Sequence, residues 1–403
     1  MTIDPFAPAQ LGPITLRNRT IKAATFEGAA PSGLVSQRLI DYHLAVAEGG
    51  VGMTTVAYLA VSPEGRTHAD QIHWRPEALP GLQLLTDAIH ATGAKVSAQI
   101  GHAGPVANSA SNGSPSIGPS RHFNALSMRF DRTATRADLD RIVADHARAA
   151  HMAADVGFDA VEVHLGHNYL PSAFLSPKLN KRKDEFGGSL DNRGTFPRRI
   201  VEAVRQAVGD RIAVTAKLNM RDGYRGGFDL EESIPFAQTL ESDGHLDALE
   251  LTGGSSLMNP MYLFRGDAPI SQMVQRMPLP KPTKAGMRVG GKAFFKEYPW
   301  EPLYFLEQAR QFRSAVSMPL ILLGGVTDHA SIATAMDEGF EFVAMGRALL
   351  REPDLINRLQ ANHDTASKCI HCNDCMSTIY IGTHCYLDKD HTYGPAIPIQ
   401  KGA

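Results

Sequence analysis

Eight short apolar runs, each followed by a longer stretch of helical period, constrain the fold of this 403-residue chain more than any other feature. The runs are too short for helices and are rich in aliphatic and β-branched residues, so they predict strands. Their nearly continuous apolar character predicts a parallel sheet that is buried on both faces. The expected strands are Thr20–Thr25, Val51–Ala57, Lys95–Ile100, Asp159–His164, Ile212–Lys217, Asp247–Leu251, Pro319–Leu323 and Glu341–Met345.

Eight strand–helix units predict a closed (β/α)8 TIM barrel of the α/β class, with a doubly wound open sheet as the alternative. A bare barrel takes about 250 residues, so roughly 150 remain. Most of this excess falls in residues 101–135, 252–299 and 362–403. The first two segments follow strands, where such barrels build their active sites. We therefore expect a barrel with long βα loops over residues 1–361 and a C-terminal extension over residues 362–403.

The composition limits the partners of the chain. It has 40 Lys+Arg against 42 Asp+Glu, and this balance argues against a nucleic-acid-binding protein. No apolar run is long enough to cross a membrane, and the N-terminus has no signal-peptide pattern. All four cysteines lie between Cys369 and Cys385, which argues against a disulfide framework. We therefore expect a cytoplasmic protein.

Two glycine-containing turns follow the last two expected strands, at Gly324-Gly325 and Gly346-Arg347. Barrels often bind a phosphate at this place, where backbone N–H groups converge on an anion. Glycine allows the backbone to approach closely, and arginine binds phosphate oxygens in bidentate fashion. The alternative is that the glycines only serve tight turns and that Arg347 pairs with a carboxylate.

His164, His167 and Tyr169 come at the end of the fourth expected strand. Two imidazoles at the mouth of a barrel could donate hydrogen bonds to a substrate oxygen, and a phenol that stays protonated at neutral pH can act as an acid. Two alternatives remain open. The residues could be structural, or the histidines could be ligands of a zinc hydrolase whose third ligand is not identified.

The run from His164 to Arg193, HLGHNYLPSAFLSPKLNKRKDEFGGSLDNR, resembles the signature of the Old Yellow Enzyme family, the NADH:flavin oxidoreductases. Other matching motifs occur in family order, namely LRNRTIKAAT, VSAQIGHAG, LLGGVTD and AMGRALL. The resemblance covers about residues 5–360. It implies an FMN-containing barrel that uses NADH or NADPH to reduce activated C=C bonds, with hydride transfer from flavin N5.

The resemblance also implies roles for single residues. The residues that would hold FMN are Ala24, Thr25, Ala57, Gln99, Lys217, Gly324, Gly325, Gly346 and Arg347. His164 and His167 would bind the activating oxygen of the substrate, and Tyr169 would donate the proton. The expected substrate is a small activated alkene, such as an enone, enal, nitroalkene or enoyl thioester. The oligomeric state stays open, with a homo-oligomer among the alternatives.

Four positions depart from the usual pattern of the family and indicate a divergent subclass. Lys217 stands where most relatives carry arginine, and a lysine lacks the planar bidentate fork. Asn168 replaces a glycine, and asparagine tolerates the left-handed conformation that a turn there would need. Ala24 replaces a proline, and Phe26 replaces a threonine or cysteine.

The cysteine segment has a spacing typical of metal ligands. Cys369, Cys372, Cys375 and Cys385 resemble the four-cysteine [4Fe–4S] motif of the 2,4-dienoyl-CoA reductases, although the spacing is shorter. Three alternatives follow: a zinc ion, a [4Fe–4S] cluster, or four free thiols. Zinc is favoured because no electron partner for a cluster is identified in the chain. The alternative function on the same barrel is a lyase or metal-dependent hydrolase acting on a phosphate-bearing substrate.

Overall fold

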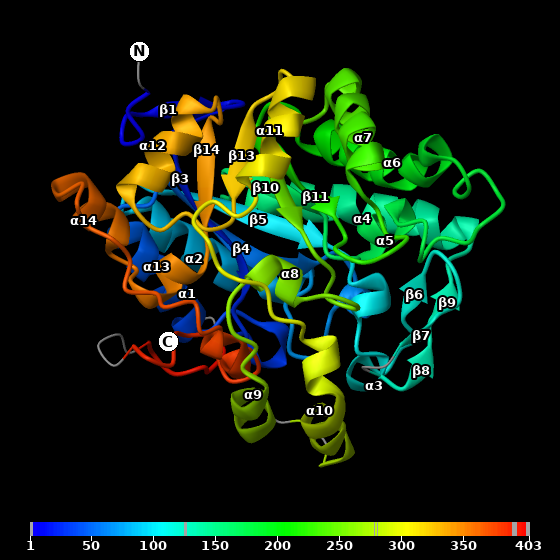
Figure 1. The fold of residues 1–403 in the computed structure, drawn as a ribbon. Helices are drawn as coiled ribbons and strands as arrows, with labels where there is room; N and C mark the ends of the chain where they lie inside the picture. The colour runs from blue at the N-terminus through cyan, green and yellow to red at the C-terminus, as the bar shows by residue number, and fades with distance from the viewer. Residues whose placement is uncertain (1–2, 125–126, 278, 280, 389–392, 400–403) are drawn as a thin grey trace.

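Eight parallel strands close into a barrel in the computed structural model, which describes residues 3–124, 127–277, 279, 281–388 and 393–399 (Figure 1). The closed ring excludes the doubly wound open sheet, and each expected strand overlaps one of the eight. The strands are β3 (Thr20–Phe26), β4 (Met53–Ala60), β5 (Lys95–Gly101), β10 (Ala160–Leu165), β11 (Ala213–Arg221), β12 (Ala248–Gly253), β13 (Leu320–Leu323) and β14 (Phe342–Met345). The ring closes where β14 pairs with β3, in the register Met345↔Lys22.

At least one helix follows each strand and covers the outside of the barrel. These helices are α1 (Gln37–Glu48), α2 (Leu79–His90), α4 (Arg136–Asp155), α6 (Leu190–Val208), α7 (Leu230–Asp243), α11 (Leu306–Ala315), α12 (His329–Asp337), α13 (Arg347–Arg351) and α14 (Leu355–Ala361). Their apolar faces pack on the strands in one large hydrophobic cluster. Among the helices that the structure describes, none is long and apolar enough to cross a membrane.

A short hairpin, β1 (Ala9–Leu11) with β2 (Ile14–Leu16), covers the N-terminal end of the barrel. Leu11 and Leu16 are buried in one cluster with the residues that fill the N-terminal layer of the barrel, among them Met53 and Phe342. The sequence analysis did not predict this hairpin.

The long βα loops carry extra elements at the opposite end of the barrel, the lower end in Figure 1. The elements of these loops are α3 (Ser109–Asn112), β6 (Ile117–Gly118), β7 (Phe123–Asn124), β8 (Arg129–Phe130), β9 (Arg132–Thr133), α5 (Leu170–Leu175), α8 (Met261–Phe264), α9 (Ile270–Arg276) and α10 (Lys281–Phe294). Short 3₁₀ turns occupy Pro31–Gly33, Pro63–Gly65, Pro76–Ala78, Gly104–Val106 and, in the tail, Asp374–Thr378. Surplus length thus lies at the end where the sequence predicts the site.

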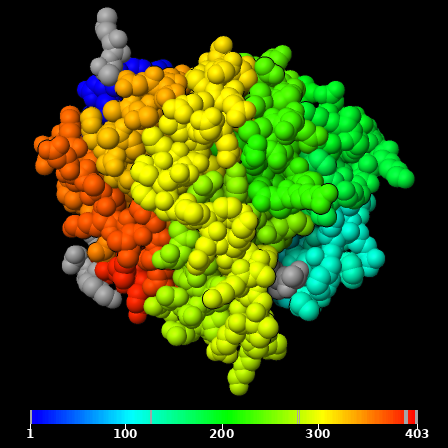
Figure 2. Space-filling view, viewed as in Figure 1, coloured from blue at the N-terminus to red at the C-terminus, as the bar shows by residue number. Residues whose placement is uncertain are grey.

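The C-terminal tail packs beside α9 at this same end, as the ribbon and the space-filling view both show (Figures 1 and 2). Arg276 of α9 forms an ion pair with Asp374 of the tail. The expected extension over residues 362–403 includes residues 389–392 and 400–403, which lie outside the described residues.

Candidate functional site

The turn after β10 brings the predicted histidine pair and tyrosine together. His164 is a buried residue of β10, and the chain then turns through His167 and Asn168 with φ of 58° and 61°. Asparagine is one of the few residues that adopt this left-handed conformation readily, so the expectation for Asn168 is confirmed. Tyr169 follows as the residue that precedes helix α5.

The three side chains form a compact group. The ring centroids of His164 and Tyr169 are 4.4 Å apart, and those of His164 and His167 are 5.1 Å apart. His167 Nε2 lies 3.0 Å from Thr252 Oγ1. Within the described part of the chain, His164 Nδ1 has no hydrogen-bond partner although it is buried. An unpaired buried nitrogen is costly in a folded protein, so this atom is available for a ligand.

Burial keeps all three groups uncharged at neutral pH. It is the largest cause that lowers the pKa of His164 well below its usual range, and the charges of His167 and Lys217 lower it further. Burial, followed by the charge of Lys217, lowers the pKa of His167 to about 3. Burial raises the pKa of Tyr169, and Tyr380 adds to this shift. The site therefore presents neutral imidazoles and a protonated phenol.

A buried group of charges lies inside the barrel, close to these residues. Lys217 Nζ is 2.7 Å from Glu250 Oε1 and 3.0 Å from Glu162 Oε1, and Gln99 donates a hydrogen bond to Glu162 at 2.7 Å. The side chains of Lys217, Glu162 and Glu250 are at most 4% exposed. Lys217 is thus paired with two acidic side chains, a pairing that the sequence analysis, which placed Lys217 among the residues that would hold FMN, did not predict.

The two carboxylates determine the charge of this group. They raise the pKa of Lys217 although burial opposes them. Burial raises the pKa of Glu250 to about 8, while Lys217 counteracts this shift. Sequence reasoning missed Glu250, although a glutamate inside an otherwise apolar strand, ALELTG, is a detectable signal.

The residues expected at the phosphate lie at the ends of β13 and β14. Gly324 and Gly325 have φ of 106° and 79°, which other residues rarely adopt. A Cβ atom built on Gly346 would meet only Thr25 Cγ2, at 3.9 Å, so there is open space beside this backbone. Together with the buried donors of Gln99 and Lys217, this space fits the FMN that the resemblance implies.

Arg347 is already bonded to two other segments. Its guanidinium donates to the carbonyl oxygen of Arg265 at 2.8 Å and to Asn373 Oδ1 in the tail. Asn373 in turn donates to the carbonyl oxygens of Phe264 and Asp267, both at 2.9 Å. Arg347 therefore connects β14 to the cysteine segment, a contact that the sequence analysis did not predict.

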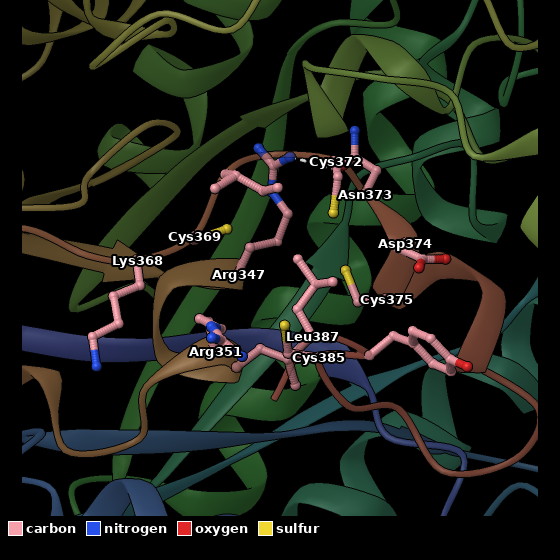
Figure 3. A pocket seen from close by; sticks show the side chains of 13 residues that line it. Arg347, Arg351, Lys368, Cys369, Cys372, Asn373, Asp374, Cys375, Cys385 and Leu387 are labelled. Atoms are coloured by element: carbon pink, nitrogen blue, oxygen red, sulfur yellow. Dashed lines mark hydrogen bonds between the residues drawn. The ribbon is translucent and has the colours of Figure 1, made fainter. Parts of the chain in front are cut away.

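The four cysteines line one small cavity (Figure 3). Arg347, Arg351 and Lys368 are also among its lining residues. In the described residues, however, no three His, Cys, Asp or Glu side chains are placed to hold a metal ion. Cys369, Cys372, Cys375 and Cys385 thus line the same cavity, but the described residues show no site for a single zinc ion. The structure likewise gives His164 and His167 no third ligand in these residues.

The tail also reaches the mouth of the barrel. Thr383 Oγ1 donates to the carbonyl oxygen of Phe26, and the Thr383 N–H donates to that of Glu27 at 2.7 Å. The ring of Tyr380 contacts His68, which contacts Phe26. Sequence reasoning missed His68 and Tyr380, because neither lies in a recognisable motif.

Comparison with known protein families gives a match over residues 4–249 to the NADH:flavin oxidoreductase / NADH oxidase family. The 4,4'-dithiodibutanoate disulfide reductase of Rhodococcus erythropolis is 56% identical over 382 residues, which cover 95% of this chain and 94% of the relative. These matches do not support the alternative of a lyase or metal-dependent hydrolase.

Two longer proteins are also similar. The metal reductase of Desulforamulus reducens (strain ATCC BAA-1160 / DSM 100696 / MI-1) is 31% identical over 93% of this chain and 52% of its own length. The structure of 2-naphthoyl-CoA reductase with 2-naphthoyl-CoA superimposes with a TM-score of 0.79 and 24% identity, over 94% of this chain and 56% of that one. The chain thus spans about half the length of these two proteins.

Proposed function

The chain belongs to the NADH:flavin oxidoreductase / NADH oxidase family, and on this premise we propose that it binds FMN at the mouth of the barrel and reduces a small organic disulfide with NADH or NADPH. The observation that carries this proposal is the 56% identity, over nearly the whole chain, with a reductase of 4,4'-dithiodibutanoate. The family implies the flavin and the nicotinamide nucleotide. Bound FMN supplies two-electron transfer between the nicotinamide and the acceptor.

The residues that would hold FMN are those at the C-terminal ends of the strands, namely Ala24, Thr25, Ala57, Gln99, Lys217, Gly324, Gly325, Gly346 and Arg347. Gln99 offers both a donor and an acceptor to a pyrimidine edge. Glu162 and Glu250 raise the pKa of Lys217, so its ammonium stays protonated and would donate a hydrogen bond to the flavin.

His164, His167 and Tyr169 would act on the acceptor. The two electrons break the S–S bond and leave two thiolates, which take up two protons to give two thiols. Imidazole N–H groups stabilise negative charge that develops on a sulfur or oxygen atom. The neutral Tyr169 hydroxyl can deliver one of the protons, because burial keeps it protonated.

An activated alkene is the second candidate acceptor. The grouping of His164, His167 and Tyr169 favours it, because two donors can hold a carbonyl or nitro oxygen while a phenol protonates the neighbouring carbon. This chemistry needs the same residues as disulfide reduction, so the two acceptors differ in the rate at which each reoxidises the flavin.

The test uses the purified FMN-loaded protein under anaerobic conditions. NADH or NADPH should bleach the flavin, and 4,4'-dithiodibutanoate should restore its colour and yield two thiols per nucleotide oxidised. Cyclohex-2-enone, mixed with the same reduced enzyme, tests the alkene. Faster reoxidation by the enone would favour the second candidate, and a protein that retains no FMN would refute both.

For the cysteine cavity we propose a [4Fe–4S] cluster rather than zinc. A cubane holds its four thiolates farther apart than one tetrahedral ion does, and the cysteines surround a cavity without converging on one point. Arg347, Arg351 and Lys368 would offset the negative charge of such a cluster. Anaerobically purified protein should contain about four iron and four sulfide per chain. Stoichiometric zinc without iron would contradict this proposal.

A further inference from the structure

His68 lies at the mouth of the barrel, in the loop that follows β4. Its ring meets that of Phe26 edge-on, with 5.2 Å between the centroids, and that of Tyr380 at 5.7 Å. Phe26 pairs with Ala57 in the register of β3 and β4, and Tyr169 packs against the small cluster that contains Ala57. His68 and Tyr380 are therefore neighbours of the candidate site, although the proposed reaction does not use them.

The hydrogen bonds of His68 determine its tautomer. Burial lowers its pKa, so the ring is neutral at pH 7. The backbone N–H of Asp70 donates to His68 Nδ1 at 3.1 Å, so Nδ1 is an acceptor. A neutral imidazole carries one proton, which must then be on Nε2. Nε2 is buried without a hydrogen-bond partner in the described residues. The fold thus holds a buried N–H donor with no acceptor, a state that proteins rarely leave unsatisfied.

Tyr380 supplies a second donor, on a ring whose centroid lies 5.7 Å from that of His68. Its hydroxyl has no hydrogen-bond partner among the residues that the structure describes, and its side chain is 42% exposed, so solvent molecules can reach it. Tyr380 also contributes, after burial, to the raised pKa of Tyr169, in keeping with its place beside the reacting groups. The charge of Asp70 raises the pKa of His68 and that of Arg66 lowers it. Because the two charges oppose each other, a ligand at His68 would be bound through hydrogen bonds more than through charge.

We propose that His68 Nε2–H and the Tyr380 hydroxyl form a subsite that binds a carboxylate at the far end of the acceptor substrate. The two oxygens of a carboxylate can accept one hydrogen bond from each donor. The ring of Phe26 gives an apolar wall for the methylene chain between the carboxylate and the reacting group. This inference rests on the proposed function, because it names the residues that bind the non-reacting end of the proposed substrate.

The test is a binding measurement on the oxidised FMN-loaded enzyme with decanedioate, followed by calorimetry or by the change in flavin absorbance. Decanedioate has the length of 4,4'-dithiodibutanoate with two methylene groups in place of the sulfurs, so it cannot be reduced. His68→Phe keeps the ring shape but removes the donor, and it should weaken binding about tenfold. Tyr380→Phe should weaken it by a similar factor. The matched control is His73→Phe in the same loop, whose Nδ1 is paired with Arg75, and it should leave binding unchanged.

Unchanged affinity in His68→Phe, or no binding of decanedioate to the unmodified enzyme, would overturn the subsite. Loss of FMN from His68→Phe would do the same, because it would assign the donor to the cofactor. Measuring reduction of the disulfide as well distinguishes failure of the subsite from failure of the proposed function. If the enzyme binds decanedioate through His68 but does not reduce the disulfide, only the disulfide proposal fails. If His68→Phe binds normally and the enzyme reduces the disulfide, only the subsite fails.

Discussion

The sequence alone could group His164, His167 and Tyr169, because they are neighbours in the chain at the end of a strand. Glu250 could not be found in the same way. It is 33 positions from Lys217 along the chain, and only the pairing of β11 with β12 in the closed barrel places Lys217 directly opposite Glu250. Contacts of this kind depend on the tertiary register, which local patterns do not contain.

The phenol of Tyr169 gives the first prediction. Tyr169→Phe removes the proposed acid without changing the shape of the site, so reduction of the acceptor should slow by roughly 10²–10⁴-fold. Bleaching of the flavin by NADH or NADPH should stay near normal, since that step needs no proton from Tyr169. Stopped-flow measurements of the two half-reactions check this, and equal slowing of both would show that Tyr169 has another role.

The raised pKa of Glu250 gives a prediction for pH. Burial raises the pKa of Glu250 in the folded protein, so the folded protein keeps a proton on Glu250 to a higher pH than the unfolded chain does. The stabilising contribution is therefore complete at low pH and is lost as the pH rises toward 8. Glu250→Gln cannot lose a proton, so its melting temperature relative to the unmodified protein should rise between pH 5 and 8. A constant difference across this range would contradict the assignment.

At the scale of elements, continuous apolar runs were sufficient to predict the barrel strands, and the 3.6-residue period was sufficient for long helices such as α4. They were insufficient for β1 and β2, because three residues each carry too little pattern. The short helices between β12 and α11 were also missed. Two of them, α8 and α9, have only four and seven residues, too few to show a helical period, and contacts with the tail hold α9 in place.

Asn373 fixes the cysteine segment to the barrel, and its removal gives the third prediction. Its side chain accepts from Arg347 and donates to the carbonyl oxygens of Phe264 and Asp267, and its φ is 56°. Asn373→Ala loses these bonds and adds left-handed strain, so docking of the segment should weaken by about 2–4 kcal/mol. Hydrogen exchange should rise in the cysteine segment while the barrel strands stay protected. Ile370→Ala, at a residue 68% exposed in the same segment, is the control.

At the scale of the whole molecule, the two ends of the barrel differ in composition and in expected role. The hairpin fills the N-terminal end with apolar side chains, and the loops and the tail gather the polar groups at the other end. The sequence predicted the barrel, and it placed the candidate site at the end where the long loops lie. It did not predict that the tail covers part of the mouth, because chain segments some 350 positions apart form that contact.

This division predicts that stability and activity can be changed separately. Leu16→Ala, at a fully buried residue of the hairpin, should lower the free energy of unfolding by about 2–5 kcal/mol. The rate of acceptor reduction per folded molecule should not change. Chemical denaturation and steady-state kinetics measure the two effects. Leu84→Ala, at a half-exposed residue, should stay within about 0.5 kcal/mol of the unmodified protein.

The double attachment of Arg347 has a thermodynamic consequence. The same guanidinium lies at the end of β14, where a phosphate is expected, and is bonded to Asn373 of the tail. A ligand that replaces Asn373 on this guanidinium must weaken the docking of the tail. A ligand that leaves the bond between Arg347 and Asn373 intact binds to a site that the docked tail has already ordered. Reciprocity then requires that the tail alter the affinity for the ligand by the same factor by which the ligand alters the docking of the tail.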